Sequence, residues 1–184
     1  MNNCQHFKLA MAVAQRLAIR LYVSEARNSG IIAQLRAVAE TPSHNSQLVD
    51  VFSDLQYNRT SLTLTASLAD DLVETAVGIV SKALSTITVT QHEGSHPRIG
   101  TVDHISCHDI TSVAPGTTTV GSVTAASINL AQQLSQAIAA LGPSTFLYGQ
   151  ANATHMGLAE LRRHLGLPCE CVRSSEQPRL CRSA

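Results

Sequence analysis

Two long stretches of the chain carry apolar residues at steps of three and four, which is the spacing of an amphipathic helix. The first covers residues 67–84 and the second covers residues 121–141. Ser67 stands where it can cap the first helix, and Gly142 and Pro143 stop the second. Each stretch has one wide apolar face, so both are predicted to be helices that pack on the core.

Shorter segments with alternating or continuous apolar residues are predicted to be strands. Residues 61–65 alternate between polar and apolar side chains, as in a strand with one buried face. The turn at residues 57–59 favours an antiparallel pairing of this strand with the one before it. The order of all elements predicts an α+β fold, a mixed β-sheet with helices packed on one face. The remaining elements are short helices at 29–39 and 158–165, and strands at 21–24, 47–56, 101–110 and 145–148.

The 184 residues are expected to form one domain between two terminal segments. Residues 1–20 are basic and carry apolar residues at helical spacing. This extension is either a helix that packs on the sheet or a targeting peptide. Residues 21–166 form the predicted domain, and residues 167–184, rich in Cys, Arg and Ser, are expected to be a poorly ordered tail.

Composition narrows the classes of function. The formal net charge is zero, aromatic residues make up 3% and Trp is absent, so a nucleic-acid partner is not expected. No apolar run is long enough to predict a membrane span. The five cysteines form no even framework, which favours a reduced, intracellular protein. We predict a cytoplasmic location, with a mitochondrial or plastid location as the alternative because of the basic N-terminus.

Titratable side chains gather in the loop at residues 92–104, HEGSHPRIGTVDH. Its two glycines permit backbone angles that are closed to other residues, and its proline fixes its own φ. Such a loop holds side chains in set directions. His96 suits proton transfer near neutral pH, and Arg98 suits the binding of a carboxylate. In the alternative interpretation the polar residues only shape the loop, with Arg98 in an ion pair with Asp103 or Glu93.

The eight histidines raise the question of a metal site. His104 and His108 lie four apart in a predicted strand, where four residues span ~13 Å, too far to chelate one ion. His92 and His96 lie in the loop but have no nearby third ligand. The spacing of the cysteines in the tail is also unusual for zinc, so no metal is predicted.

Three ordered blocks of sequence are similar to a known family. Residues 94–100, GSHPRIG, followed by Val102 and Asp103, resemble the His-Pro-Arg-hydrophobic-Gly signature of the formiminotransferase N-terminal subdomain. Residues 57–60 are similar to its Asn-Arg-Thr turn, and residues 145–149 to its Leu-Tyr-Gly strand. The resemblance is to the short, plant-like branch in which this subdomain stands alone.

The resemblance implies a transferase that moves a formimino group from N-formiminoglutamate to tetrahydrofolate as co-substrate, in the histidine and one-carbon metabolism of the cell. The family's catalytic histidine corresponds to His96, which would take up one proton and give another as a general acid and base. The residues expected to bind substrate or folate are Asn58, Arg59, His92, Arg98, Asp103 and Tyr148.

The chain departs from the family pattern at Ser95, where Glu is usual, and at Gln150, where an acidic residue is usual. The full enzyme also has a second subdomain, with folate between the two. A homodimer partner or another protein is therefore expected to supply the missing wall. The alternative function is a non-catalytic folate-binding or regulatory module that keeps the fold. Asn58 and Arg59 would then only hold a turn.

Overall fold

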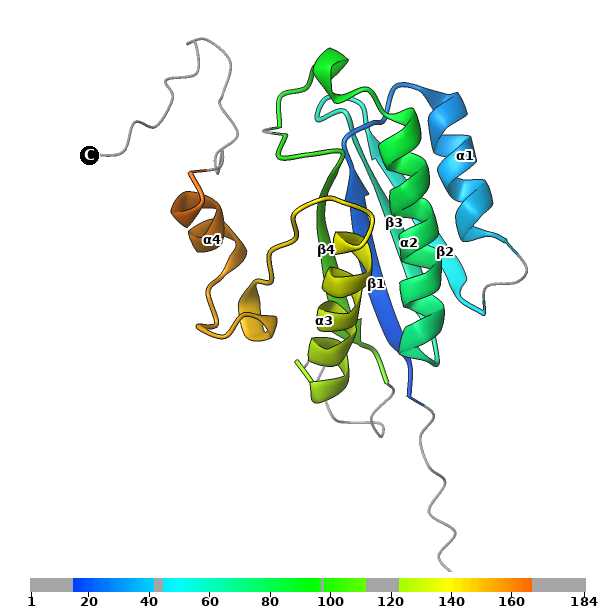
Figure 1. Cartoon of the computed structure of the whole chain (residues 1–184). Coiled ribbons are helices and arrows are strands. Elements are labelled where there is room, and N and C mark those ends of the chain that lie inside the picture. The colour runs from blue at the N-terminus through cyan, green and yellow to red at the C-terminus, as the bar shows by residue number, and fades with distance from the viewer. Residues whose placement is uncertain (1–14, 42–44, 97, 112–122, 167–184) are drawn as a thin grey trace, which may run out of the picture.

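The computed structural model describes residues 15–41, 45–96, 98–111 and 123–166. Four strands form one sheet in the order β2-β3-β1-β4 (Figure 1). All three neighbouring pairs are antiparallel, so the predicted mixture of parallel and antiparallel pairs is absent from this part of the chain. The strands are β1 Leu17–Val23, β2 Gln47–Asp54, β3 Arg59–Ala66 and β4 Val102–Asp109.

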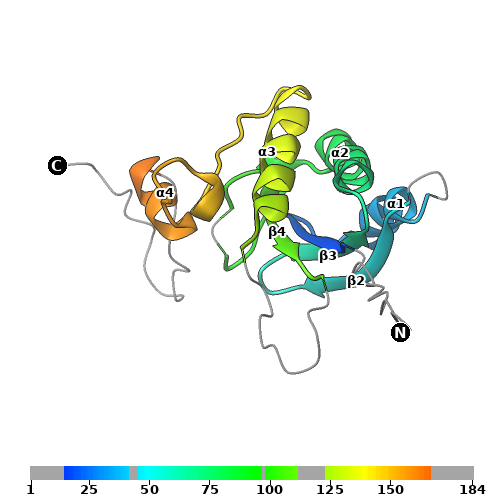
Figure 2. The same ribbon diagram turned by 90° about the horizontal axis from the view of Figure 1, so that it is seen from below.

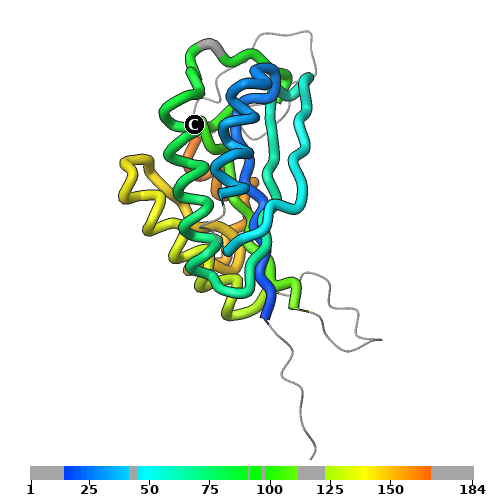
Figure 3. The backbone as a smooth tube through the Cα atoms, turned by 90° about the vertical axis from the view of Figure 1, so that its right-hand side faces the viewer, coloured from blue at the N-terminus to red at the C-terminus, as the bar shows by residue number. Residues whose placement is uncertain are grey.

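Three helices cover one face of the sheet, as Figures 2 and 3 show, and this confirms the predicted α+β class. Alternate residues of β1, from Leu17 to Val23, and Leu62 and Leu64 of β3 are buried beneath these helices. No helix of the described chain covers the opposite face, which we call the open face. The helices are α1 Ser29–Ala39, α2 Ala69–Thr86 and α3 Ala125–Ala139.

Most predicted helices are confirmed, but the cap of one of them differs from expectation. Asn28 caps α1, since its side chain accepts hydrogen bonds from the amides of Gly30 and Ile31 at 3.1 Å each. The prediction that Ser67 caps α2 is wrong, because Leu68 occupies the N-cap position and makes no side-chain cap bond. Short 3-10 turns lie at Val89–Gln91 and Gly149–Ala151, and helix α4 covers Leu158–His164.

Two predicted elements have a different structure. Residues 17–20, which the spacing assigned to an N-terminal helix, lie in β1, because their apolar side chains serve a two-residue period just as well. Residues 145–148 are not a strand. Instead of joining the sheet through its backbone, this segment contacts β4 through the Tyr148 hydroxyl, which donates to the Ile105 carbonyl at 3.0 Å.

Helix α4 lies beyond β4, the strand at one edge of the sheet, and away from α1 and α2 (Figures 1 and 2). The expected tail and residues 1–14 of the expected extension fall outside the described residues. Among the helices that are described, none has the length and apolar composition to span a membrane.

Candidate functional site

Asn58 anchors the loop at residues 92–104, which we call the histidine loop, to the turn between β2 and β3. It is buried and has a φ of +51°, a conformation that asparagine tolerates better than most residues. Its side-chain oxygen accepts from the amide of Ala26 at 2.8 Å, and its side-chain nitrogen donates to the carbonyl of Glu93 at 3.1 Å. Nε2 of His92 donates to the Asn58 carbonyl at 2.9 Å. Both side chains therefore fix backbone, as the turn-holding interpretation of Asn58 requires.

Gly94 lets this loop lie directly on the turn. A Cβ atom at this position would stand 2.4 Å from the carbonyl oxygen of Tyr57, closer than real contacts allow. The next residue, Ser95, donates from its amide to the carbonyl of Gln56 at 3.1 Å. The loop thus leaves the turn at a fixed point, one residue before His96.

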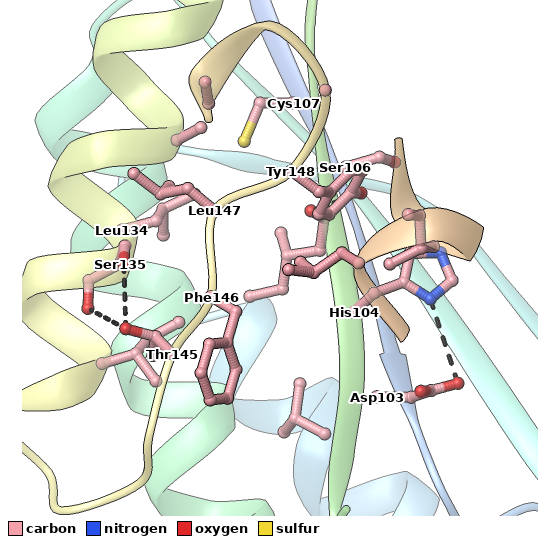
Figure 4. A pocket seen from close by; sticks show the side chains of 18 of the residues that line it. Asp103, His104, Ser106, Cys107, Leu134, Ser135, Thr145, Phe146, Leu147 and Tyr148 are labelled. Atoms are coloured by element: carbon pink, nitrogen blue, oxygen red, sulfur yellow. Dashed lines mark hydrogen bonds and ion pairs between the residues drawn. The ribbon is translucent and has the colours of Figure 1, made fainter. Parts of the chain in front are cut away.

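A β-bulge turns two neighbouring side chains of β4 onto the open face. Leu21 pairs with Ile105 and Val23 with Val102, so Tyr22 stands opposite two residues, Asp103 and His104. Val102 and Ile105 both pack against the core. The two residues between them therefore share the open face. Figure 4 shows them on the opposite side of β4 from Cys107 and Leu134.

The guanidinium of Arg59, at the start of β3, connects these side chains. Its Nη1 lies 3.0 Å from Nε2 of His96, and its Nη2 lies 2.9 Å from Nδ1 of His104. The same Nη2 forms an ion pair with Oδ2 of Asp103. Because a guanidinium only donates, Nε2 of His96 and Nδ1 of His104 accept these two bonds and carry no proton. We call Arg59, His96, Asp103, His104 and Arg162 the arginine cluster.

Asp103 is the acceptor that holds this cluster together. Its other oxygen, Oδ1, lies 3.0 Å from Nη2 of Arg162 in α4, and its side chain is 2% exposed. Burial by itself would raise the pKa of Asp103, but the charges of Arg59 and Arg162 hold it below its usual value. Burial lowers the pKa of Arg59, and the charge of Asp103 opposes this shift. The carboxylate is therefore ionised at neutral pH.

Aromatic rings support the cluster from the sheet. The ring of Tyr22 stacks on that of His104, with centroids 4.3 Å apart, and the guanidinium carbon of Arg59 lies 4.6 Å from the Tyr22 centroid. The ring of Tyr57, in the turn, lies 5.3 Å from that of His96. These contacts limit the rotation of both imidazoles.

A cavity of about 710 Å³ lies beside β4, between α3, the segment after it and α4 (Figure 4). Tyr148 and Cys107 line it, and burial raises the pKa of each to about 12. Both groups are therefore protonated at neutral pH. Cys107 also packs against the core, in agreement with its interpretation as a small core residue rather than a reactive thiol.

The structure brings together three of the predicted site residues: Arg59, His96 and Asp103. Asn58 and His92 fix the histidine loop to its turn, and we call these two residues the loop anchor. Tyr148 lines the cavity. Arg98 is exposed. Of the two alternative partners for Arg98, Asp103 is paired with other arginines through both of its oxygens.

The sequence reasoning missed Tyr22, His104 and Arg162. The alternation of a regular strand would place His104 on the opposite face from Asp103, and no local pattern announces the bulge. Arg162 stands 59 positions after Asp103 along the chain. Arg162 is one of several basic residues on a short helix, and nothing in the sequence indicates that its side chain contacts the sheet.

Within the described ranges, no group of three or more His, Cys, Asp or Glu side chains could hold a metal ion. The two imidazoles of the arginine cluster face a guanidinium, which occupies the space between them. That arrangement suits acid–base chemistry and the binding of anions.

Fold and site together define an α+β subdomain that carries histidine and arginine side chains on the uncovered face of an antiparallel sheet. The family model for the formiminotransferase domain, N-terminal subdomain, matches residues 16–177. The chain therefore belongs to the formiminotransferase N-terminal subdomain family.

Several curated proteins are similar to the chain. The formiminotransferase cyclodeaminase-like protein of Arabidopsis thaliana is 32% identical over 151 residues, which are 80% of this chain and 48% of that protein. The formimidoyltransferase-cyclodeaminase of Sus scrofa is 34% identical over 71% of this chain and 22% of its own length. The glutamate formimidoyltransferase of Streptococcus pyogenes serotype M1 is 37% identical over 44% and 26%. The chain thus spans less than half the length of each.

Proposed function

We propose that this protein transfers a formimino group from N-formiminoglutamate to tetrahydrofolate, with His96 as the general acid and base. The observation that carries the proposal is the contact between His96 and Arg59. It joins the histidine of the family signature to an arginine of the turn, on a face of the sheet that is open to ligands. Membership of the family and similarity to proteins named formimidoyltransferases support the same reaction.

The reaction requires two proton movements and no oxidation or reduction. The folate amine nitrogen attacks the amidine carbon and forms a new C–N bond, and this nitrogen loses a proton. The bond between that carbon and the glutamate nitrogen then breaks, and the departing nitrogen gains a proton. A single imidazole that first accepts and then donates a proton satisfies both steps.

Arg59 also links the binding of substrate to the release of the base. In the structure, Nε2 of His96 accepts a hydrogen bond from Arg59. A carboxylate forms a stronger, charge-assisted bond with a guanidinium than a neutral imidazole does. A substrate carboxylate that reaches Arg59 therefore frees Nε2 of His96 for proton transfer.

The open face is where we place the second wall of the site. Phe52 and Val49 of β2 are 59% and 58% exposed, and Phe52 pairs with Ser61 on this face. Exposed apolar side chains beside a charged cluster favour a covered state. A homodimer partner or another protein would provide this cover.

The test is turnover of N-formiminoglutamate and tetrahydrofolate by the purified chain and by the His96→Ala variant. We expect the variant to lose at least ~100-fold in kcat, the size of a general acid–base contribution. His164→Ala is the matched control, because His164 is exposed at the end of α4 and should leave kcat unchanged. A folded wild-type protein without turnover, at any protein concentration, contradicts an enzyme that works alone or as a homodimer.

The second candidate function is a non-catalytic module that keeps the fold and binds folate. Calorimetric titration with tetrahydrofolate separates the two functions. A binding module shows affinity without turnover, and His96→Ala leaves its affinity intact. An enzyme shows turnover that depends on His96.

A further inference from the structure

His104 has one ring nitrogen engaged and the other available. Its Nδ1 lies 2.9 Å from Nη2 of Arg59, which has no lone pair and can only donate. The carboxylate oxygen of Asp103 is 3.9 Å from the same Nδ1, too far for a good hydrogen bond. Nδ1 is therefore the acceptor of the Arg59 bond. In the neutral ring the proton then resides on Nε2.

The Nε2–H group of His104 is accessible and has no partner within the described part of the chain. The ring makes its two polar contacts, with Arg59 and Asp103, through Nδ1 alone. Nε2 is also absent from the buried, unpaired side-chain atoms of the described residues, so solvent reaches it. Stacking on Tyr22 fixes the plane of the ring. His104 thus presents a hydrogen-bond donor in a set direction.

The surroundings of this donor carry a net positive charge. Arg59 and Arg162 contribute two charges and Asp103 contributes one opposite charge, which gives an excess of one cation. The side chains of the two arginines are only 12% and 14% exposed, so water screens this charge less than at an open surface. On the same face, Arg20 is paired with Asp50 at 3.4 Å and adds no excess.

We propose that His104 is a substrate-binding residue that donates from Nε2 to a carboxylate on the open face, beside the excess charge of Arg59 and Arg162. The ligand class is a small dicarboxylate or a glutamyl group. This deepens the proposed function and rests on it, since N-formiminoglutamate carries two carboxylates. His104 acts on affinity and orientation, and His96 performs the proton transfer.

Two substitutions separate the donor from the rest of the ring. In His104→Asn the side-chain amide reaches the position of Nδ1, so its oxygen can still accept from Arg59 while the donor at Nε2 is lost. In His104→Gln the longer side chain returns an N–H donor near the position of Nε2. His108→Asn is the matched control, because His108 is exposed on the same strand and contacts only Ser106.

The first readout is independent of turnover. Histidine labelled with 15N reports by NMR which ring nitrogen carries the proton, and glutarate serves as the dicarboxylate probe. We expect His104 in the Nε2–H form and a shift of its Nε2 signal as glutarate binds. We also expect glutarate to bind at least ~10-fold more weakly to His104→Asn, and within about threefold of wild type to His104→Gln and His108→Asn.

The second readout is steady-state kinetics. Loss of the donor should raise KM for N-formiminoglutamate by at least ~10-fold in His104→Asn while kcat changes less than about threefold. An Nδ1–H tautomer, an Nε2 signal that glutarate leaves unmoved, or equal affinities of wild type and a folded His104→Asn would each overturn the proposal. Wild-type protein that binds glutarate through His104 without turnover contradicts only the transferase.

Discussion

The loop anchor and the arginine cluster are built from the same kinds of side chain, yet they use them in opposite ways. In the anchor, Asn58 and His92 bond to backbone groups and fix where the chain runs. In the cluster, His96 and His104 bond to a side chain, Arg59. Two histidines four positions apart in one loop therefore have different surroundings: His92 fixes the loop and His96 belongs to the arginine cluster.

The largest expected effect comes from the loss of Asp103, the only carboxylate among the residues of the arginine cluster. In Asp103→Asn, two largely buried guanidinium groups are left without an anion, and we expect a loss of about 3–5 kcal/mol in the free energy of unfolding. Urea denaturation at pH 7 measures this loss. The control is Asp50→Asn, which removes an exposed pair and should cost less than about 1 kcal/mol.

The effect of Asp103 also has a predictable pH dependence. The pKa of Asp103 is lower in the folded protein than in the unfolded chain, so its stabilising contribution is present above the unfolded value of roughly 3.9 and is lost as the pH falls toward the folded value. The stability difference between wild type and Asp103→Asn should therefore shrink below about pH 4. An equal difference at pH 7 and at acidic pH, where both proteins remain folded, would count against this role.

The loop anchor should be lost if the histidine loop cannot lie against the turn at residues 57–59. Gly94→Ala places a methyl group against the carbonyl of Tyr57, and we expect a loss of about 2 kcal/mol together with a large loss of kcat, because His96 is moved from Arg59. Gly157→Ala is the control, since its Cβ meets nothing within 4 Å and its φ of −69° is ordinary. Thermal unfolding and turnover, measured on the same samples, test both effects.

The smallest expected effect is that of substituting His92, and it tests whether His92 and His96 have different roles. His92→Ala removes one hydrogen bond to the Asn58 carbonyl and should cost about 1 kcal/mol of stability. It should reduce kcat far less than His96→Ala does. If His92→Ala abolished turnover while the protein kept its stability, His92 would belong to the reaction and the division between anchor and cluster would fail.

The fold was more predictable than the site. Helix α2 was readable because its apolar face repeats over 18 residues, and the turn at Asn58 correctly indicated the antiparallel pairing of β2 and β3. Residues 17–20 were misread because a short apolar run fits a helix and a strand equally well. The contact of Arg59 with Asp103 joins two different strands, and only the assembled sheet brings them together.

The three missed residues show where local patterns end. His104 faces the same way as Asp103 because of a bulge, which depends on pairing with a distant strand. Arg162 reaches Asp103 from a seven-residue helix whose position beside β4 is a tertiary feature. In the sequence Tyr22 looks like one more apolar residue of a strand, but its ring contacts the guanidinium of Arg59 and the imidazole of His104.

The bulge at Tyr22 makes the site depend on the length of β4 as well as on its side chains. Val102 and Ile105 must both point into the core, and only an insertion of one position leaves two neighbours on the outer side. Removing a single residue between them would restore an unbroken ladder and a sound strand. It would also leave room for one polar side chain where the cluster uses two. For this stretch of sequence, a deletion is therefore a more severe change than most substitutions.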